Sequence, residues 1–259
     1  MPNTAEQLFP HSKERFEDRR KQTSDRKLLD EFFDHPPLLA ISRMVTQGQF
    51  DAIDYPISTG KEGGVFRATS PAGYRAVKVY RIGNAVFRRI PPYALEELKR
   101  EASARNFARL VFAWTRREHS MLRKLRAAEV RVPEPYGYLR NVLVMEFIGT
   151  DGLPAPRLRD AVIPDAKAFY ADLVVQMRRM TIDARLVHGD LSPYNVLLDR
   201  NTPVLIDVAQ SIPSDHPQAK ALFERDMTNF ARYLRKLGVD VSDAELFSAA
   251  GGARVGPKE

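Results

Sequence analysis

The sequence predicts an α+β protein divided into two lobes, and three features of the chain support this fold class. Short runs rich in β-branched residues alternate with glycine turns over residues 55–82, as in paired antiparallel strands. A connector rich in Pro and Gly, GTDGLPAPRL, follows at residues 149–158. Beyond it, apolar residues recur mainly with helical spacing. We therefore expect a β-rich lobe with one inserted helix, a connector, and a mainly helical lobe.

The order of the elements sets the expected domain boundaries. Residues 1–52 are expected to form a helical extension, residues 53–147 the first lobe and residues 148–259 the second. Within the lobes, strands are expected at 55–69, 74–82, 136–140 and 141–149, and helices at 94–128, 165–184 and 217–237. Because the chain ends 52 residues after Asp207, we expect about one long helix and a tail beyond that residue.

Composition restricts the class of protein. Of the 259 residues 44% are hydrophobic, which is enough for a substantial core, and the absence of cysteine excludes disulfides and thiolate metal sites. The sequence contains no run of 18 uncharged apolar residues, and its first residues lack the apolar stretch of a secretory signal. We expect a cytoplasmic, monomeric protein without a membrane partner.

Positive charge is concentrated in one part of the chain. Residues 81–131 hold 13 Lys or Arg against 5 Glu, a local net charge of +8 in a chain whose total is +7. Such a stretch forms either a solvated helix face or a surface that binds RNA or another polyanion, and the sequence leaves both interpretations open.

A glycine turn and a strand lysine are the first candidate site residues. The stretch STGKEGGV lies between two expected strands, where backbone N–H groups could cradle phosphate oxygens; Ser58, Gly60 and Lys61 are the candidates. The same turn would also serve as an ordinary hairpin. Lys78, within AVKVY, either points outward from the strand or is held by a carboxylate.

Glu118 is the candidate carboxylate. It lies four residues after Trp114 and four before Leu122, so it shares the apolar stripe of the expected helix. A carboxylate on that face reaches solvent at the edge of the stripe or pairs with a buried cation. Pairing with Lys78 would give the Lys–Glu arrangement that phosphoryl transfer uses.

The stretch LVHGDLSPYNVLLDRNTPVLIDVAQS contains the most informative polar residues. Asp190 and Asn195 are five residues apart across a turn, and Asp207 ends the strand-like run PVLID. Carboxylate and amide oxygens suit Mg²⁺, and an aspartate can accept a proton from a nucleophile. Either aspartate alone would fit an ordinary turn, but the three together favour a metal-assisted site. His188 is expected to hold the loop rather than to act chemically.

Taken together, these motifs resemble the RIO-type atypical protein kinases, most closely the type-one branch, from about Ile53 to Asn229. STGKEGGV is similar to the phosphate loop, AVKVY to the lysine strand, WTRRE to helix C, VLVMEFIG to the hinge, HGDLSPYN to the catalytic loop and LIDVAQS to the metal loop. The resemblance implies a bilobal protein-kinase-like fold with an antiparallel-sheet N-lobe. It also implies a short, mainly helical C-lobe without the usual activation and peptide-binding segments.

The resemblance implies a role for each matching residue in a serine/threonine protein kinase with ATPase activity. Asp190 would be the catalytic aspartate, Asn195 and Asp207 the Mg²⁺ ligands, and Lys78 the phosphate lysine paired with Glu118. The backbone at Glu146 and Ile148 would contact the adenine of ATP. Asp207 would also accept phosphate as an aspartyl-phosphate, and Mn²⁺ would be able to replace Mg²⁺.

The resemblance also implies a partner. Members of the RIO-type family mature the small ribosomal subunit, so residues 81–131 would contact the rRNA and proteins of its precursor. The loop reads GKEGG where the family commonly has GKEAN, and we expect the extra glycines to loosen it. Two alternatives remain: a small-molecule phosphotransferase of the aminoglycoside-kinase kind, whose loop is similar, and a catalytically silent ATP-binding module.

Overall fold

The computed structural model describes residues 35–82, 90–101 and 107–257, and these residues divide into two compact units. The first unit comprises residues 1–119 and 135–147, and the second comprises residues 120–134 and 148–259. The expected boundary after residue 147 coincides with one of these divisions, whereas residues 120–134 belong to the second unit. The expected helical extension lies outside the described residues up to residue 34.

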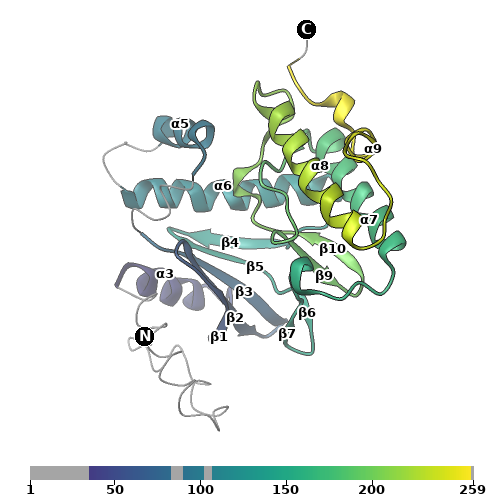
Figure 1. Cartoon of the computed structure of the whole chain (residues 1–259). Helices are drawn as coiled ribbons and strands as arrows, with labels where there is room; N and C mark the ends of the chain where they lie inside the picture. The colour runs from purple at the N-terminus through teal and green to yellow at the C-terminus, as the bar shows by residue number, and fades with distance from the viewer. Residues whose placement is uncertain (1–34, 83–89, 102–106, 258–259) are drawn as a thin grey trace. The chain divides into compact units, whose positions relative to one another are not determined.

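An antiparallel sheet of five strands forms the centre of the first unit, in the order β1-β2-β3-β5-β4. Its strands are β1 (Ala52–Thr59), β2 (Gly63–Ser70), β3 (Gly73–Tyr80), β4 (Pro135–Leu139) and β5 (Val142–Glu146). Helix α3 (His35–Thr46) packs on one face, where Ile41 and Met44 are buried against Phe66 and Val144 (Figure 1). Truncation of a buried phenylalanine such as Phe66 to alanine typically costs about 3–5 kcal/mol.

Two helices stand over the stretch 94–128, where the sequence predicts either one helix or a helix broken once. Helix α5 (Pro92–Glu101) precedes α6 (Phe107–Ala127), and the residues between them lie outside the described part of the chain. The two helices are joined by an ion pair between the buried guanidinium of Arg117 and Glu97. Helix α6 begins in the first unit and ends in the second.

The second unit is mainly helical and contains short two-stranded pairings. Its helices are α7 (Ala166–Arg178), which continues as a π-helical turn (Arg179–Asp183), α8 (Ala219–Lys236) and α9 (Asp243–Ala249) (Figure 1). Single turns of 3-10 helix occur at Leu158–Asp160, Val208–Gln210 and Gly252–Arg254. The strands pair as β6 (Gly149–Thr150) with β7 (Leu153–Pro154), β8 (Leu186–Val187) with β11 (Ile212–Pro213), and β9 (Val196–Asp199) with β10 (Thr202–Leu205).

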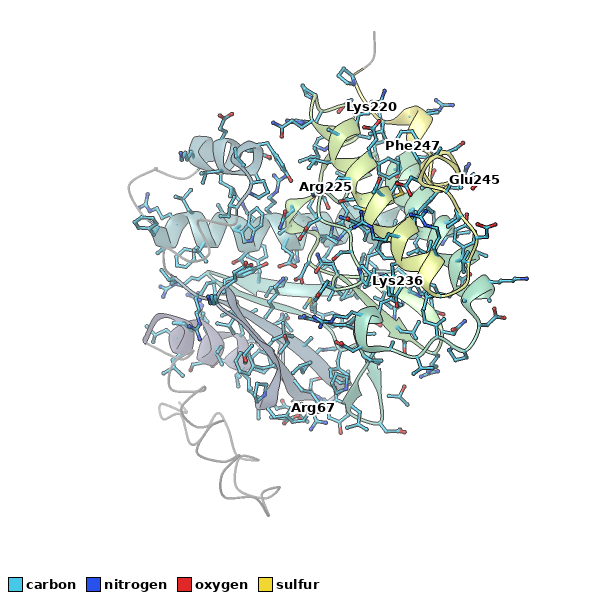
Figure 2. All side chains as sticks on the ribbon, viewed as in Figure 1. Arg67, Lys220, Arg225, Lys236, Glu245 and Phe247 are labelled. Carbon is cyan, nitrogen blue, oxygen red and sulfur yellow. The ribbon has the colours of Figure 1, made fainter. Side chains whose placement is uncertain are left out.

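The region after Asp207 contains more structure than the single long helix we expected. Helix α9 begins with a capping box, in which the Ser242 hydroxyl accepts from Glu245 N and the Glu245 carboxylate accepts from Ser242 N. Phe247 of α9 packs against Phe223 of α8, with ring centroids 5.3 Å apart (Figure 2). This helix was missed because its 7 residues are too few to show a helical period. In the described part of the chain, no helix is long and apolar enough to cross a bilayer.

Candidate nucleotide and phosphoryl-transfer site

The glycine turn of the first unit is a tight hairpin between β1 and β2. Only residues 60–62 lie outside the two strands, and Gly60 N donates to Gly63 O (2.9 Å). Gly63 is already a strand residue, paired with Tyr80, and a β-carbon at Gly63 would lie 2.3 Å from the Val79 carbonyl oxygen. The expectation that the extra glycines loosen the loop was therefore wrong for Gly63, because this glycine permits close strand pairing.

The predicted phosphate-loop residues differ in exposure. Ser58 pairs with Val65 in the β1–β2 ladder and is half-buried, whereas Gly60 and Lys61 are exposed at the turn. The side chain of Lys61 is therefore accessible to an anion, as a phosphate cradle requires, whereas the N–H of Gly60 already donates to Gly63 O.

Lys78 and Glu118 form an ion pair within the first unit. Lys78 lies in the third position from the end of β3, and its Nζ is 2.7 Å from Oε1 of Glu118 on α6. The Glu118 side chain is buried, so of the two possibilities that the sequence left open, the structure shows pairing with a cation. Tyr80, which the sequence analysis missed, donates its hydroxyl to the second oxygen of the same carboxylate. Strand alternation places Tyr80 on the same face as Lys78, because residues two apart on a strand share a face.

The hinge residues stand at the division between the two units. Glu146 is the last residue of β5, where it is half-buried, and Ile148 is buried. The carbonyl of Ile148 accepts from Ala155 N (2.9 Å).

In the second unit, hydrogen bonds bring the catalytic-loop and metal-loop motifs together at the backbone of Ile206. Ile206 N donates to Asn195 O (3.0 Å), and Ile206 O lies 3.0 Å from Nε2 of His188. Because a carbonyl oxygen only accepts, Nε2 of His188 carries the proton. The predicted loop-holding role of His188 agrees with this contact. Asp207 follows directly, so its position is fixed by both contacts.

Asp190 and Asn195 are joined across their turn. The Nδ2 amide of Asn195 donates to Asp190 O (2.7 Å) and to Asp190 Oδ2 (3.2 Å). Gln210, in the turn after Asp207, approaches the same oxygen, with its Nε2 at 3.5 Å. Asp190 is nevertheless exposed. Since Nδ2 of Asn195 serves Asp190, the Oδ1 atom of Asn195 is the one that could bind a cation.

Asp207 adopts an unusual backbone conformation. Its φ and ψ angles of 58° and 45° are left-handed, a region that non-glycine residues seldom enter. Six other described non-glycine residues share a positive φ, and Asp207 is the one among them that is a predicted metal ligand: Glu129, Arg140, Asp151, Arg185, Arg200 and Asn201 are the others. Among residues 35–82, 90–101 and 107–257, no cluster of three His, Cys, Asp or Glu side chains could hold a metal ion. The predicted pair is instead one amide and one carboxylate, which suits Mg²⁺ that takes its other ligands from phosphate and water.

The buried carboxylate of Asp226 on α8 binds the backbone of the HGDLSPYN loop. The sequence analysis missed this residue. Its Oδ2 accepts from Gly189 N (3.0 Å), and the Leu191 backbone also bonds to the carboxylate. The neighbouring Arg225, which projects from α8 in Figure 2, donates to Gly189 O. Asp226 and Arg225 thus hold the backbone on both sides of Asp190.

Burial shifts the pKa values of two groups under this loop. It raises the pKa of Asp226 to about 7, against the opposing effects of the Leu191 backbone, Arg225 and the Gly189 backbone. It also lowers the pKa of His188, so this imidazole is neutral. Nδ1 of His188 and Oδ1 of Asp226 are buried and accept no hydrogen bond from the described residues. Oδ1 of Asp226 nevertheless lies 3.5 Å from Nη2 of Arg225, so the loop rests on a neutral imidazole and on a carboxylate that is close to one guanidinium.

Comparison with solved structures identifies the fold. The fold is that of the Rio2 kinase from Chaetomium thermophilum, with a TM-score of 0.65 at 24% identity over 86% of this chain and 70% of that one. A second structure, of the Rio2 kinase-ADP/Mg2+-phosphoaspartate complex from the same organism, gives a TM-score of 0.62 at 21% identity over 89% and 74% of the two chains. The predicted bilobal kinase-like fold is confirmed.

Sequence comparison then defines the family. Residues 64–247 match the RIO domain. The chain is 33% identical to the RIO-type serine/threonine-protein kinase Rio1 of Methanocaldococcus jannaschii, over 95% of this chain and 85% of that protein. It is 36% identical to Rio1 of Haloferax volcanii, over 90% and 80%, and 36% identical to human serine/threonine-protein kinase RIO1, over 88% and 41%. The chain belongs to the RIO-type serine/threonine-protein kinase family, as its motifs predict.

Proposed function

We propose that this kinase transfers the γ-phosphoryl group of ATP in the presence of Mg²⁺ and acts in maturation of the small ribosomal subunit. The observation that supports this chemistry best is the pair of hydrogen bonds made by the backbone of Ile206. Asn195 and His188 bind the two sides of its backbone, so the residue that precedes Asp207 is fixed to the loop that carries Asp190. Three oxygen-bearing side chains are thereby mounted on one rigid backbone, while Asp190 stays accessible.

Each candidate residue has a place in nucleotide binding. The turn at Ser58, Gly60 and Lys61 would bind phosphate oxygens, with Lys78 as a further cation. The backbones of Glu146 and Ile148 would hold the adenine. Oδ1 of Asn195 and the carboxylate of Asp207 would hold Mg²⁺, with Mn²⁺ as a substitute. The metal ion would supply charge neutralisation on the phosphate oxygens.

Two routes for the phosphoryl group follow from the carboxylates. In transfer to a hydroxyl, exposed Asp190 accepts the hydroxyl proton while the oxygen bonds to the γ-phosphorus and the bond to ADP breaks. In the ATPase route, an Asp207 oxygen bonds to the γ-phosphorus and ADP leaves, which forms an aspartyl-phosphate. Water then hydrolyses this acyl phosphate to inorganic phosphate and the free carboxylate.

Phosphate release and covalent labelling test this chemistry. Purified protein with Mg·ATP should release inorganic phosphate and, with γ-labelled ATP, retain a label that hydroxylamine removes. Asp207→Asn should abolish the hydroxylamine-labile label, because an amide side chain lacks the carboxylate oxygen that forms an acyl phosphate. A persistent labile label in this variant would exclude Asp207 as the acceptor. Phosphorylation of an aminoglycoside by the wild-type protein would favour the small-molecule alternative.

The proposed ribosomal partner is supported by helix α6. Arg109 and Arg116 are exposed and seven residues apart, which places them on one face two turns from each other. The helix contains one acidic residue, Glu118, and that residue is buried. The exposed surface of α6 is therefore basic, as contact with RNA phosphates requires.

Co-sedimentation with small ribosomal subunits at two salt concentrations tests this surface. The double variant Arg109→Glu/Arg116→Glu should bind more weakly and lose much of the salt dependence. Lys220→Glu/Lys236→Glu changes the net charge equally at two exposed positions of α8 (Figure 2), and this control should bind like the wild type. Equal loss in both variants would indicate an effect of net charge alone. Binding that ignores salt would contradict an RNA contact through α6.

A further inference from the structure

Strand β3 presents two donors to one buried carboxylate. Lys78 and Tyr80 are two residues apart and project from the same face of the strand. Lys78 Nζ is 2.7 Å from Oε1 of Glu118, and the Tyr80 hydroxyl donates to Oε2. The ammonium also lies 5.0 Å from the centroid of the Tyr80 ring. The three side chains therefore form a closed triangle in which each contacts the other two.

The position of Tyr80 is fixed by its backbone. Tyr80 N donates to Asn141 O (2.9 Å), and Asn141 Nδ2 donates to Tyr80 O (2.7 Å). On the other side Tyr80 pairs with Gly63 at the start of β2. Tyr80 and Asn141 are both buried. The hydroxyl is consequently a fixed donor, and the carboxylate that it binds has little freedom to rotate.

We propose that Tyr80 is a positioning residue for Lys78, acting through Glu118; this inference rests on the proposed phosphoryl-transfer function. With Oε2 occupied by the tyrosine hydroxyl, Glu118 offers a single oxygen to the lysine. Lys78 is then held by one carboxylate oxygen, which fixes the direction of its ammonium group. Without the hydroxyl, both carboxylate oxygens turn to Lys78 and draw it away from the nucleotide.

The same contact ties helix α6 to the sheet independently of any ligand. Movement of α6 away from β3 would break the ion pair and would also leave the buried Tyr80 hydroxyl without its acceptor. The free-energy cost of leaving buried polar groups without hydrogen-bond partners opposes such movement strongly. The lysine–glutamate pair of this kinase is thus kept assembled by a neutral third residue.

The test compares Tyr80→Phe with wild type in two backgrounds. We expect Tyr80→Phe to lower kcat for phosphate release about 10-fold while KM for ATP changes less than about 2-fold. In a Glu118→Ala background the same substitution should lower kcat by less than about 2-fold, because the group through which Tyr80 acts is gone. Tyr233→Phe, which removes one hydroxyl bond to Leu158 O in the second unit, is the matched control and should keep kcat within about 2-fold.

Amide hydrogen exchange of nucleotide-free protein provides a readout independent of turnover. Tyr80→Phe should raise exchange over residues 111–118 of α6 by about 5-fold, and Tyr233→Phe should leave it unchanged. Unchanged kcat and unchanged exchange in Tyr80→Phe would overturn the proposal, as would an equal loss of kcat in both backgrounds. If wild-type protein released no phosphate, the proposed function would fail, and exchange in α6 would still decide whether Tyr80 holds Glu118.

Discussion

The two units of this kinase hold their charged groups in opposite ways. In the first unit the candidate carboxylate is buried and satisfied by other side chains: Glu118 receives Lys78 on one oxygen and Tyr80 on the other. In the second unit the candidate reactive groups are accessible, and buried side chains hold the backbone beneath them. Asp226 binds Gly189 N, and His188 contacts Ile206 O.

Because of this difference, substitutions in the two units should affect stability and activity differently. Removing either charge of the Lys78–Glu118 pair leaves the other without its partner, so stability and activity should fall together. Removing an accessible carboxylate of the second unit leaves the supporting backbone contacts in place, so activity alone should be lost. Four substitutions test this contrast, from the largest expected effect to the smallest.

Asp190→Asn should give the largest loss of activity among the four substitutions, with very little loss of stability. We expect phosphate release to fall about 100-fold or more, because an amide cannot accept the substrate proton. The free energy of unfolding should stay within about 0.5 kcal/mol of wild type, as is usual for an exposed position. Steady-state ATP turnover and urea denaturation measure the two quantities. Unfolding of the variant at much lower urea would contradict the contrast.

Glu118→Ala should give the largest loss of stability. The ammonium of Lys78 and the hydroxyl of Tyr80 would both lose their buried acceptor, and breaking a buried ion pair of this kind costs about 3–5 kcal/mol. Urea denaturation of the variant beside wild type checks this value. A loss below about 1 kcal/mol, the range of exposed pairs, would show that water replaces the carboxylate and that the cluster is not closed.

Asp226 should make stability depend on pH in a direction opposite to that of most carboxylates. Its pKa is raised from 3.8 to about 7 on folding, so the folded state binds the proton more tightly than the unfolded state. Its contribution is fully present below pH 3.8, declines as pH rises towards 7, and is constant above; the total is on the order of 4 kcal/mol.

Asp226→Asn isolates this contribution, because the amide keeps an oxygen acceptor for Gly189 N–H but does not titrate. The free energy of unfolding of the wild type minus that of this variant should fall between pH 5 and about 7 and stay constant at higher pH. The lowered pKa of His188 acts with the opposite sign, since stability is lost as pH falls below its unfolded value of 6.5, and it is present in both proteins. Parallel stability curves for the two proteins would contradict the assignment to Asp226.

Glu134→Gln should have the smallest effect. The pair between Arg126 and Glu134 is solvent-accessible, with side chains 39% and 43% exposed. Exposed ion pairs contribute about 0–1 kcal/mol, so the midpoint of urea denaturation should barely move and turnover should be unchanged. A loss comparable to that of Glu118→Ala would remove the distinction between buried and exposed pairs in this protein.

Local patterns predicted the residues whose neighbours lie close in sequence. Asp190, Asn195 and Asp207 fall within one short stretch, and Glu118 was identified because it interrupts an apolar stripe of its own helix. Asp226 was missed although the same argument applies, since it shares a helix face with Phe223 and Phe230, which are buried. Its partners are backbone N–H groups about 36 residues away, and such groups leave no trace in the side-chain sequence.

Tyr80 was missed for a different reason. Strand alternation places it beside Lys78, but an aromatic residue in a strand is expected to be core, and nothing local indicates that its hydroxyl meets a carboxylate 38 residues away. Gly63 shows the converse error: a glycine in a loop motif suggested flexibility, whereas the close approach of the Val79 carbonyl explains it. In each case the missing information is a contact distant in sequence.

The left-handed backbone of Asp207 has a consequence for how this position evolves. Glycine enters this conformation without strain, whereas a non-glycine residue is disfavoured there by about 1 kcal/mol. In a lineage under selection for stability alone, substitution to glycine would be neutral or advantageous. Retention of aspartate at this position in a descendant would therefore report continued selection for its carboxylate, and glycine there would mark a copy that kept the fold after its chemistry was lost.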